Sequence, residues 1–256
     1  MKHSHNIFFP SSWYLCLFCF VVVLSSTAVA QQAEIESIEQ TQTLPLIFSK
    51  GDITGHIKIE VHNGLVSFMI SYSAPLQSRV HKPWIWDKEL HTYGVGPSLE
   101  DSVKLFVFDP QAGYTSADVW VWRAGRTDPI GYADDMFWSS NDTERSLGKV
   151  LASGDVHADA GQLGWYSRFQ SSFVGAEVKR FFTRNPLGSC ADVRASGVWD
   201  RGKWEVVFSR PVHTEYDDDI VLHYNQQYVV IVAVRDQDSG LFTVAHKISF
   251  NLNRSE

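Results

Sequence analysis

The chain has 256 residues, of which 44% are hydrophobic, and its 22 Lys and Arg against 29 Asp and Glu give a formal net charge of −7 at pH 7. This acidic balance argues against a nucleic-acid-binding protein, because a negative surface repels the phosphate backbone. The three Cys residues are too few for a disulfide-rich scaffold.

Residues 1–30 have the layout of a secretory signal. Lys2 precedes the apolar run Trp13–Leu24, and the small residues Ala28, Val29 and Ala30 follow. The run is shorter than a membrane-spanning helix and no later segment approaches that length, so we expect export to the periplasm and no membrane span in the mature chain. Removal of the signal leaves 21 basic and 29 acidic residues, with Cys190 as a single buried or partly buried free thiol.

The mature chain begins with a polar segment and continues as one domain. Gln31–Leu44 lacks an apolar stripe and is expected to be a flexible lead-in to a single domain spanning residues 45–256. Gly55–Val61 alternates between apolar and polar residues, Asn63-Gly64 is a turn signal, and Leu65–Tyr72 alternates again. This pattern predicts a β-hairpin.

Further strands and one candidate short helix follow. The stretch 124–190 is broken by turn-forming residues, and loops of such length usually act as lids or binding surfaces. Helical periodicity is weak except at Phe173–Phe182, so the pattern predicts an all-β fold, a two-sheet antiparallel β-sandwich with long inserted loops. The expected strands are Ser102–Phe108, Ala117–Arg123, Val193–Ala195, Lys203–Arg210, Gln227–Val234 and Phe242–Leu252. The expected inner faces include Val66, Phe68, Val206, Phe208, Val230 and Val232.

The strand at Ala117–Arg123 and its exit loop form the most informative segment. Alternation places Asp118, Trp120 and Trp122 on one face and the two Val residues between them on the other. The loop that follows is dense in charge and contains the turn formers Pro129 and Gly131. The segment is typical of a cavity wall, and equally of a core strand that leads into a salt-bridged loop.

Four blocks of the sequence resemble the haem-binding domain shared by the gamma subunits of ethylbenzene dehydrogenase, by related molybdenum enzymes of the dimethyl sulfoxide reductase class and by certain c-type cytochromes. They occur in the order found in that family and cover most of the chain after about Leu65. The blocks are residues 100–105, residues 120–124 with 126–135, residues 185–197 with 202–210, and residues 228–236 with 246–249.

The resemblance implies a haem-binding electron-transfer protein without catalytic residues of its own. A Cys-x-x-Cys-His attachment motif is absent from the sequence, so the expected cofactor is non-covalent haem b, and the expected partners are molybdenum-enzyme subunits or a soluble cytochrome. The most specific block assigns the cofactor pocket to Trp120, Trp122, Arg123 and Tyr132.

The same resemblance implies axial iron ligands, a Met and a Lys, and the chain departs from both. The Met position falls on Trp120, which cannot ligate iron. Alignment on Ser249 puts His246 at the Lys position, whereas a slip by one residue selects Lys247. Alternation predicts His246 inward and Lys247 outward, and Met136 is the candidate sixth ligand.

Each ligand candidate has a structural alternative. His246 can be a hydrogen-bonded core residue, and Met136 can pack against its aromatic neighbours. Further candidates, each also explained as a surface or hydrogen-bonded side chain, are Met69, His81, His91 and His157.

Other chemistries find less support. Asp134-Asp135 and Asp217–Asp219 lack the ligand spacing of an EF-hand and are expected to be solvated acidic loops. Hydrolase and phosphate-loop motifs are absent. The alternative function is a haem-free β-sandwich that binds a ligand or a carbohydrate through exposed Trp84, Trp86 or Trp165.

Overall fold

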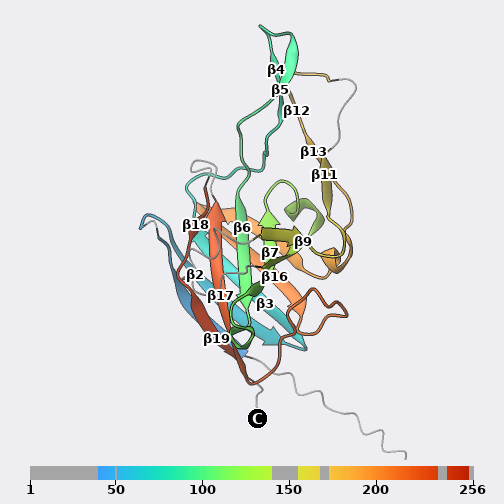
Figure 1. Cartoon of the computed structure of the whole chain (residues 1–256). Helices are drawn as coiled ribbons and strands as arrows, with labels where there is room; N and C mark the ends of the chain where they lie inside the picture. The colour runs from blue at the N-terminus through green and yellow to red at the C-terminus, as the bar shows by residue number, and fades with distance from the viewer. Residues whose placement is uncertain (1–39, 50, 140–154, 168–172, 236–240, 254–256) are drawn as a thin grey trace, which may run out of the picture. The chain divides into compact units, whose positions relative to one another are not determined.

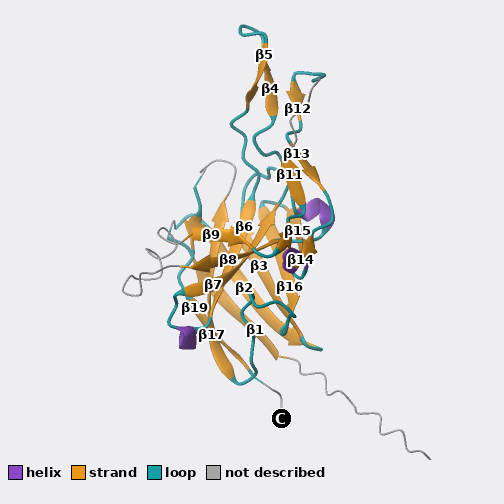
Figure 2. Cartoon of the chain, turned by 45° about the vertical axis from the view of Figure 1, so that its right-hand side comes forward, coloured by secondary structure: helices purple, strands orange, loops and turns teal. Residues whose placement is uncertain are grey.

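The computed structural model describes residues 40–49, 51–139, 155–167, 173–235 and 241–253 (Figure 1). These residues belong to one compact unit. They form antiparallel strands, and within the described ranges the only helical elements are short 3₁₀ turns at Pro110–Ala112, Asp128–Ile130 and Ser189–Ala191 (Figure 2). The predicted all-β class is confirmed. No helix in this part of the chain is both long enough and apolar enough to cross a membrane.

The first large sheet has five strands and contains the predicted hairpin. Its order is β1 (Gln40–Ile47), β2 (Thr54–His62), β3 (Leu65–Ser73), β16 (Lys203–Pro211) and β15 (Arg194–Asp200). Strands β2 and β3 pair through Val61 and Val66, and the turn residues Asn63 and Gly64 have φ of 49° and 74°. Both values are positive, as a two-residue type I′ turn requires, which explains why Asn-Gly stands there.

The second large sheet is buried on both faces. It comprises β18 (Thr243–Val244), β17 (Gln226–Arg235), β6 (Ser102–Phe108), β7 (Ser116–Arg123), β8 (Asp134–Ser139) and β9 (Asp155–Ala158) in this order, and β19 (Ile248–Leu252) pairs with β17. In β7 the side chains of Trp120 and Trp122 enter the core between the sheets, whereas Val119 and Val121 belong to an apolar cluster on the opposite face. The predicted face assignment of β7 is therefore confirmed.

Aromatic side chains join the two sheets. Phe68 of β3 contacts Trp120 of β7 with ring centroids 5.4 Å apart, and Trp122 contacts Trp204 of β16 at 4.8 Å. All six predicted inner-face residues are fully buried in this core. Burial of a side chain of this size stabilises the fold by about 1.5–3 kcal/mol, so this layer is the main source of stability.

Three small sheets lie outside the two large ones. They pair β4 (Trp84–Asp87) with β5 (Thr92–Val95) and β12 (Glu177–Val178), β11 (Trp165–Ser167) with β13 (Phe181–Thr183), and β10 (Gly161–Gln162) with β14 (Leu187–Gly188). Figures 1 and 2 show β4, β5 and β12 at one end of the chain's sandwich, beyond β11 and β13.

These small sheets correct two predictions. The expected helix at Phe173–Phe182 is wrong, because this stretch contains β12 and the start of β13, whose residues Phe181 and Phe182 pair with Ser167 and Tyr166. The stretch 124–190 is likewise not a structureless loop, because β8 lies within it and pairs with β7 in the second large sheet.

Two strand boundaries also differ from prediction. Strand β1 begins at Gln40 and pairs with β2, so residues 40–44 are not a flexible lead-in. The expected terminal strand Phe242–Leu252 is interrupted after Val244. There Ala245 donates its backbone N–H to Val232 O, and His246 donates its N–H to Ile47 O. The backbone thus leaves β17 for β1 before β19 begins.

Gly197 of β15 provides a test of the packing between the sheets. A Cβ atom at this position would lie 2.2 Å from Cζ2 of Trp122, which is itself fixed against Trp204. We expect Gly197→Ala to lower the free energy of unfolding by about 1–3 kcal/mol, measured as a lower urea midpoint. Gly94→Ala in β5, where a Cβ would meet nothing within 4 Å, is the control. Equal midpoints for the two variants would contradict this packing.

Candidate functional site

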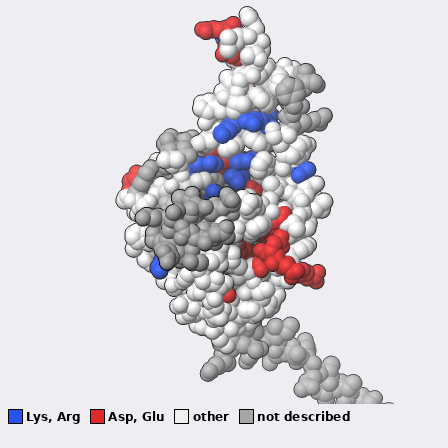
Figure 3. Space-filling model, viewed as in Figure 1, with Lys and Arg blue, Asp and Glu red and all other residues white. Residues whose placement is uncertain are grey.

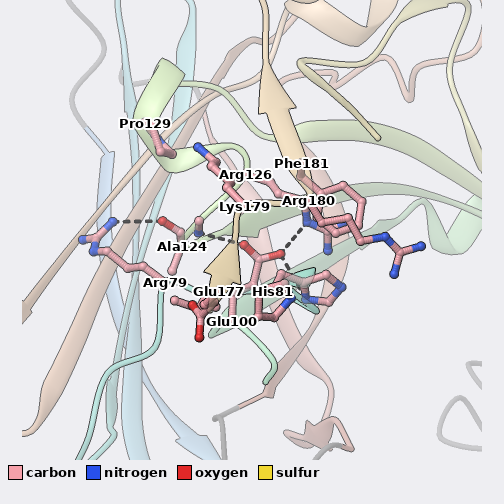
Figure 4. Close-up of a pocket in the computed structure, with 13 residues that line it drawn as sticks. Arg79, His81, Glu100, Ala124, Arg126, Pro129, Glu177, Lys179, Arg180 and Phe181 are labelled. Atoms are coloured by element: carbon pink, nitrogen blue, oxygen red, sulfur yellow. Dashed lines mark hydrogen bonds and ion pairs between the residues drawn. The ribbon is translucent and has the colours of Figure 1, made fainter. Parts of the chain in front are cut away.

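A cavity of about 360 Å³ lies at one end of the second large sheet, beside Glu100 before β6 and the turn that follows β7 (Figure 4). Its walls come from the loop before β4, from the turn after β7 and from the segment β12–β13. This volume falls at the lower end of the range for small-molecule sites. The residues that line the cavity include Arg79, His81, Glu100, Arg126, Arg180 and Phe181.

Glu100 is the centre of the cavity's hydrogen-bond network. Its side chain is fully buried, and its two carboxylate oxygens accept hydrogen bonds from Arg126 Nε at 2.5 Å and from the backbone N–H of Gly125 at 2.7 Å. A Cβ on Gly125 would lie 2.1 Å from the carbonyl oxygen of Arg79, so only glycine permits this close approach. A buried carboxylate is tolerated when it is paired and hydrogen-bonded in this way.

Arg126 is held between two aromatic rings. Its guanidinium carbon lies 4.3 Å from the ring centroid of Trp165 and 4.9 Å from that of Phe181, which are cation–π distances. Burial, together with the nearby charge of Arg123, lowers the pKa of Arg126 to about 10. The guanidinium therefore stays charged at neutral pH, and its position is rigid.

His81 faces Glu100 from the other side. Its Nδ1 lies 3.6 Å from Glu100 Oε1, its side chain is 11% exposed, and its ring centroid is 5.4 Å from that of Phe181. Burial first, and then the charge of Arg126, lower the pKa of His81 to about 3. At physiological pH the imidazole is therefore neutral, which is the form that binds metal ions.

Cationic side chains surround the cavity. Arg79 donates to Ala124 O at 3.0 Å and to Asp128 Oδ2 at 2.5 Å. Arg180 lies over the rings of Trp84 and Phe181, and its buried Nε has no hydrogen-bond partner among the described residues. Figure 3 shows Lys and Arg side chains gathered in one region of the surface, apart from a group of Asp and Glu. The cavity is suited to an anionic ligand with an apolar body.

The residues predicted from the most family-like block lie elsewhere. Trp120 and Trp122 are fully buried, and their indole N–H groups donate to Asp118 Oδ1 at 2.7 Å and Asp128 Oδ1 at 2.9 Å. Arg123 forms an ion pair with Asp134. The guanidinium carbon of Arg194 lies 3.8 Å from the ring centroid of Tyr132. None of these four predicted pocket residues lines the cavity beside Glu100. The segment is a core strand followed by a salt-bridged loop.

The predicted inward orientation of His246 is wrong. The side chain is exposed, as is that of Lys247, because the strand breaks after Val244 and its alternation restarts at Ile248. Met136 is half-buried in β8 on the face of the sheet that turns away from the core. Four strand spacings separate β18 from β8, about 19 Å. The structure does not bring His246 and Met136 close enough to contact one iron ion.

Other candidates are also placed by the structure. Met69 is half-buried in β3, and His91 and His157 are exposed. The expectation of exposed Trp residues is wrong, because all three are half-buried against neighbouring rings: Trp84 against Phe173, Trp86 against Tyr93, and Trp165 against Phe181. His81 is therefore the best-placed imidazole, and no local pattern distinguishes it in the sequence, since its environment comes from Glu100 and Phe181.

The acidic runs are not solvated loops. Asp134 and Asp135 are buried in β8, and Asp219 is buried in the loop before β17, although Asp217 is exposed. Arg210 donates to Asp118 and, at 3.0 Å, to Asp219. Burial raises the pKa of Asp219 to about 7 and that of Asp159 to about 8.

Cys190 lies beside this acidic group. It is free and buried, as predicted, and its Sγ donates to Asp159 O at 3.2 Å. Burial raises its pKa to about 11. The thiol is therefore protonated and shielded at neutral pH.

The chain is similar to one protein family in sequence and to two solved structures in fold. A family model described as "Ethylbenzene dehydrogenase" matches residues 61–242. No curated protein matches significantly. Among solved structures, a Bacteroides uniformis protein whose description proposes carbohydrate binding is 12% identical, with 84% of this chain and 81% of that chain covered and a TM-score of 0.35. The KRT10-binding region domain of the pneumococcal serine rich repeat protein PsrP is 7% identical, with 84% and 98% covered and a TM-score of 0.27.

The ion pair between Glu100 and Arg126 predicts that a single substitution at Glu100 strongly lowers the stability of the fold. Glu100→Gln preserves shape but leaves the buried guanidinium without its counter-charge, so we expect the free energy of unfolding to fall by about 3–5 kcal/mol. Chemical denaturation measures it. Glu177→Gln, at an exposed acid that lines the same cavity, is the matched control and should change stability by less than about 0.5 kcal/mol. A loss no greater than that of the control would show that Glu100 is not buried as described.

His81 should remain neutral in mildly acidic solution. Its pKa is lowered to about 3 in the folded chain, whereas an unfolded His has a pKa of about 6.5. Between these values the unfolded chain binds the extra proton, so the stability contributed by neutral His81 is complete above pH 6.5 and is lost progressively as the pH falls toward 3. An NMR titration should show the neutral imidazole signal of His81 at pH 5. A protonated ring at that pH would contradict the burial.

Proposed function

Because the chain belongs to the ethylbenzene dehydrogenase family, we propose that it is a non-catalytic electron-transfer protein that holds haem b in the cavity beside His81. The observation that carries this assignment is a neutral, mostly buried imidazole facing a fixed carboxylate at a cavity. Haem ligation by His needs the neutral ring, and a carboxylate on the other ring nitrogen fixes its tautomer and orientation.

The residues around the cavity fit the chemical groups of haem. Haem combines an apolar macrocycle with two propionate carboxylates. Val80, Pro83 and Phe181 supply apolar walls, and Arg79 and Arg180 supply positive charge for the carboxylates. The sequence lacks the motif for covalent attachment, so the group would be held by ligation and packing alone.

Each residue then has a definite role. His81 would supply Nε2 as the iron ligand, because its Nδ1 lies toward Glu100, 3.6 Å from Oε1. Glu100 lies beside His81 Nδ1, which has no hydrogen-bond partner among the described residues, and is itself fixed by Arg126 and Gly125. The ring of Phe181 packs beside the imidazole, with ring centroids 5.4 Å apart. Bound haem supplies an iron that takes up and releases one electron, and the chain makes or breaks no substrate bond.

The proposed setting follows from the N-terminal sequence and the family. We infer export to the periplasm from the signal-like residues 1–30, which lie outside the described part of the chain. The proposed partners are molybdenum-enzyme subunits or a soluble cytochrome, as for gamma subunits of this family.

The alternative is a haem-free sandwich that binds a small anionic ligand in the same cavity. It is favoured by Trp120, which occupies the position that the family resemblance gives to a Met ligand and is sealed in the core. Arg79, Arg126 and Arg180 would then bind a carboxylate or phosphate group of that ligand.

Haem reconstitution distinguishes these functions. The mature protein, mixed with haem and passed over a desalting column, should show a Soret band, and acid-acetone should extract the pigment. His81→Ala should abolish or strongly shift the band, because it removes the proposed ligand. His91→Ala, at an exposed His on the nearby β4–β5 turn, is the control and should leave it unchanged.

Two further variants locate the ligand if it is elsewhere. Loss of the band in His246→Ala or Lys247→Ala, with His81→Ala unaffected, would place the iron at the C-terminal strands and refute the His81 site. Protein that stays colourless after reconstitution would instead support the haem-free module. Calorimetric titration with inorganic phosphate would then test its anion site, with Arg180→Ala as the weakened variant.

A further inference from the structure

Three Asp residues from distant parts of the sequence meet in the interior. Asp118 lies in β7, Asp135 in the adjacent β8, and Asp219 in the loop between β16 and β17. One carboxylate oxygen from each lies within 4.8 Å of the others, and all three side chains are buried. The fold brings these carboxylates together from three separate elements, in a place that is remote from solvent.

Asp135 is the member of the group that is buried without a hydrogen-bond donor. Its side chain is 0% exposed, and neither of its carboxylate oxygens has a hydrogen-bond donor among the described residues. Its neighbours include the carboxyl groups of Asp118, Asp159 and Asp192, and Arg210 is the nearby cation. Buried polar atoms in native proteins are almost always hydrogen-bonded, so a carboxylate that points only at carboxylates needs a positive partner.

Further acceptor atoms converge on the same place without donors. Both carboxylate oxygens of Asp159 and of Asp192 are buried and accept no hydrogen bond from an N–H or hydroxyl group of the described chain. Asp118 differs, because Trp120 and Arg210 each donate to one of its oxygens. Asp159 and Asp192 therefore adjoin Asp135, while the oxygens that lie within 4.8 Å of one another are those of Asp118, Asp135 and Asp219.

The local cations do not balance this charge. Arg210 bonds to Asp118 and Asp219, and within the described residues it is the single Lys or Arg side chain bonded to the group. Its Nη2 also donates to Ile220 O at 2.6 Å, whereas its buried Nε has no hydrogen-bond partner among the described residues. One guanidinium faces the carboxyl groups of Asp118, Asp135, Asp192 and Asp219. The remainder must be protonated or must be neutralised by an ion.

We propose that Asp118, Asp135 and Asp219 bind a Ca²⁺ ion. All available donors are oxygens, which hard cations prefer, and Ca²⁺ accepts six to eight of them in flexible geometry. Mg²⁺ demands near-ideal octahedral geometry and retains water, so it suits an enclosed set of carboxylates less well. The ion would connect β7 and β8 to the loop before β17 and would stabilise the fold. This site is separate from the haem proposal.

Calcium binding is measured on the mature protein after treatment with EDTA. We expect saturable heat of binding in calorimetry, and a melting temperature that rises by about 5–10 °C when Ca²⁺ is present at about 100 times its Kd. Tb³⁺ should bind at the same place and should be sensitised by Trp120, whose indole N–H bonds to Asp118. Neither readout depends on haem.

Variants separate binding from simple charge repulsion. Asp135→Asn should abolish the rise produced by Ca²⁺, yet in EDTA it should melt at the same or a higher temperature than the unchanged protein, because it removes a repelling charge. Asp217→Asn, in the same acidic run but exposed, should retain the full rise. Identical melting of the unchanged protein in Ca²⁺ and EDTA, with no heat of binding, would overturn the site and mean that the carboxyl groups share protons. An equal rise with Mg²⁺ would overturn the assignment to Ca²⁺.

Discussion

The ion pair between Arg210 and Asp118 crosses the interior of the sandwich and fixes how the two large sheets face each other. Arg210 belongs to β16 and Asp118 to β7, and each side chain is 1% exposed. Breaking such a pair leaves an uncompensated buried charge, at a cost of about 3–5 kcal/mol, so the register of the sheets is strongly specified. The guanidinium also lies 5.2 Å from the ring of Trp120, which packs on Phe68 and Phe208. The charged contact is therefore continuous with the central aromatic packing.

The two polar sites lie at opposite ends of the same strand. Strand β7 starts beside the buried Asp group and ends at Arg123, whose neighbours Gly125 and Arg126 bind Glu100. Other buried carboxylates order loops in the same way. Asp101 accepts from Ser78 N, and Asp128 accepts from Gly197 N, each at 2.7 Å. These carboxylates therefore serve as hydrogen-bond acceptors within the fold rather than as surface charge.

Local periodicity predicted much of the fold and little of the site. Alternation located β2 and β3 and assigned their faces, because each of these strands presents one face to the core. Strands β6 and β17 were also predicted near their observed bounds, but both are buried on their two faces. It could not locate the break after Val244, because that break depends on a hydrogen bond from His246 to Ile47, a residue far away in sequence. The Asp residues were misjudged for the same reason. Their burial follows from Arg210 and from loops that only the tertiary fold brings together.

The position of Trp120 determines where a cofactor can lie in this chain. The family resemblance gives that position to an iron ligand, but here the indole is 0% exposed and bonded to Asp118, with rings of the opposite sheet against it. A macrocycle at this point would have to displace the aromatic core that holds the sheets together. The cavity beside His81 requires no such displacement, because it lies outside that core and is already open.

Haem held there would be closer to solvent than a group between the sheets. Solvent exposure is one of the factors that set reduction potentials in metalloproteins, and proximity to the surface shortens the distance to a redox partner. On the proposed function, a Trp at the position of the Met ligand would thus place the electron-transfer site at the end of the sandwich rather than in its core.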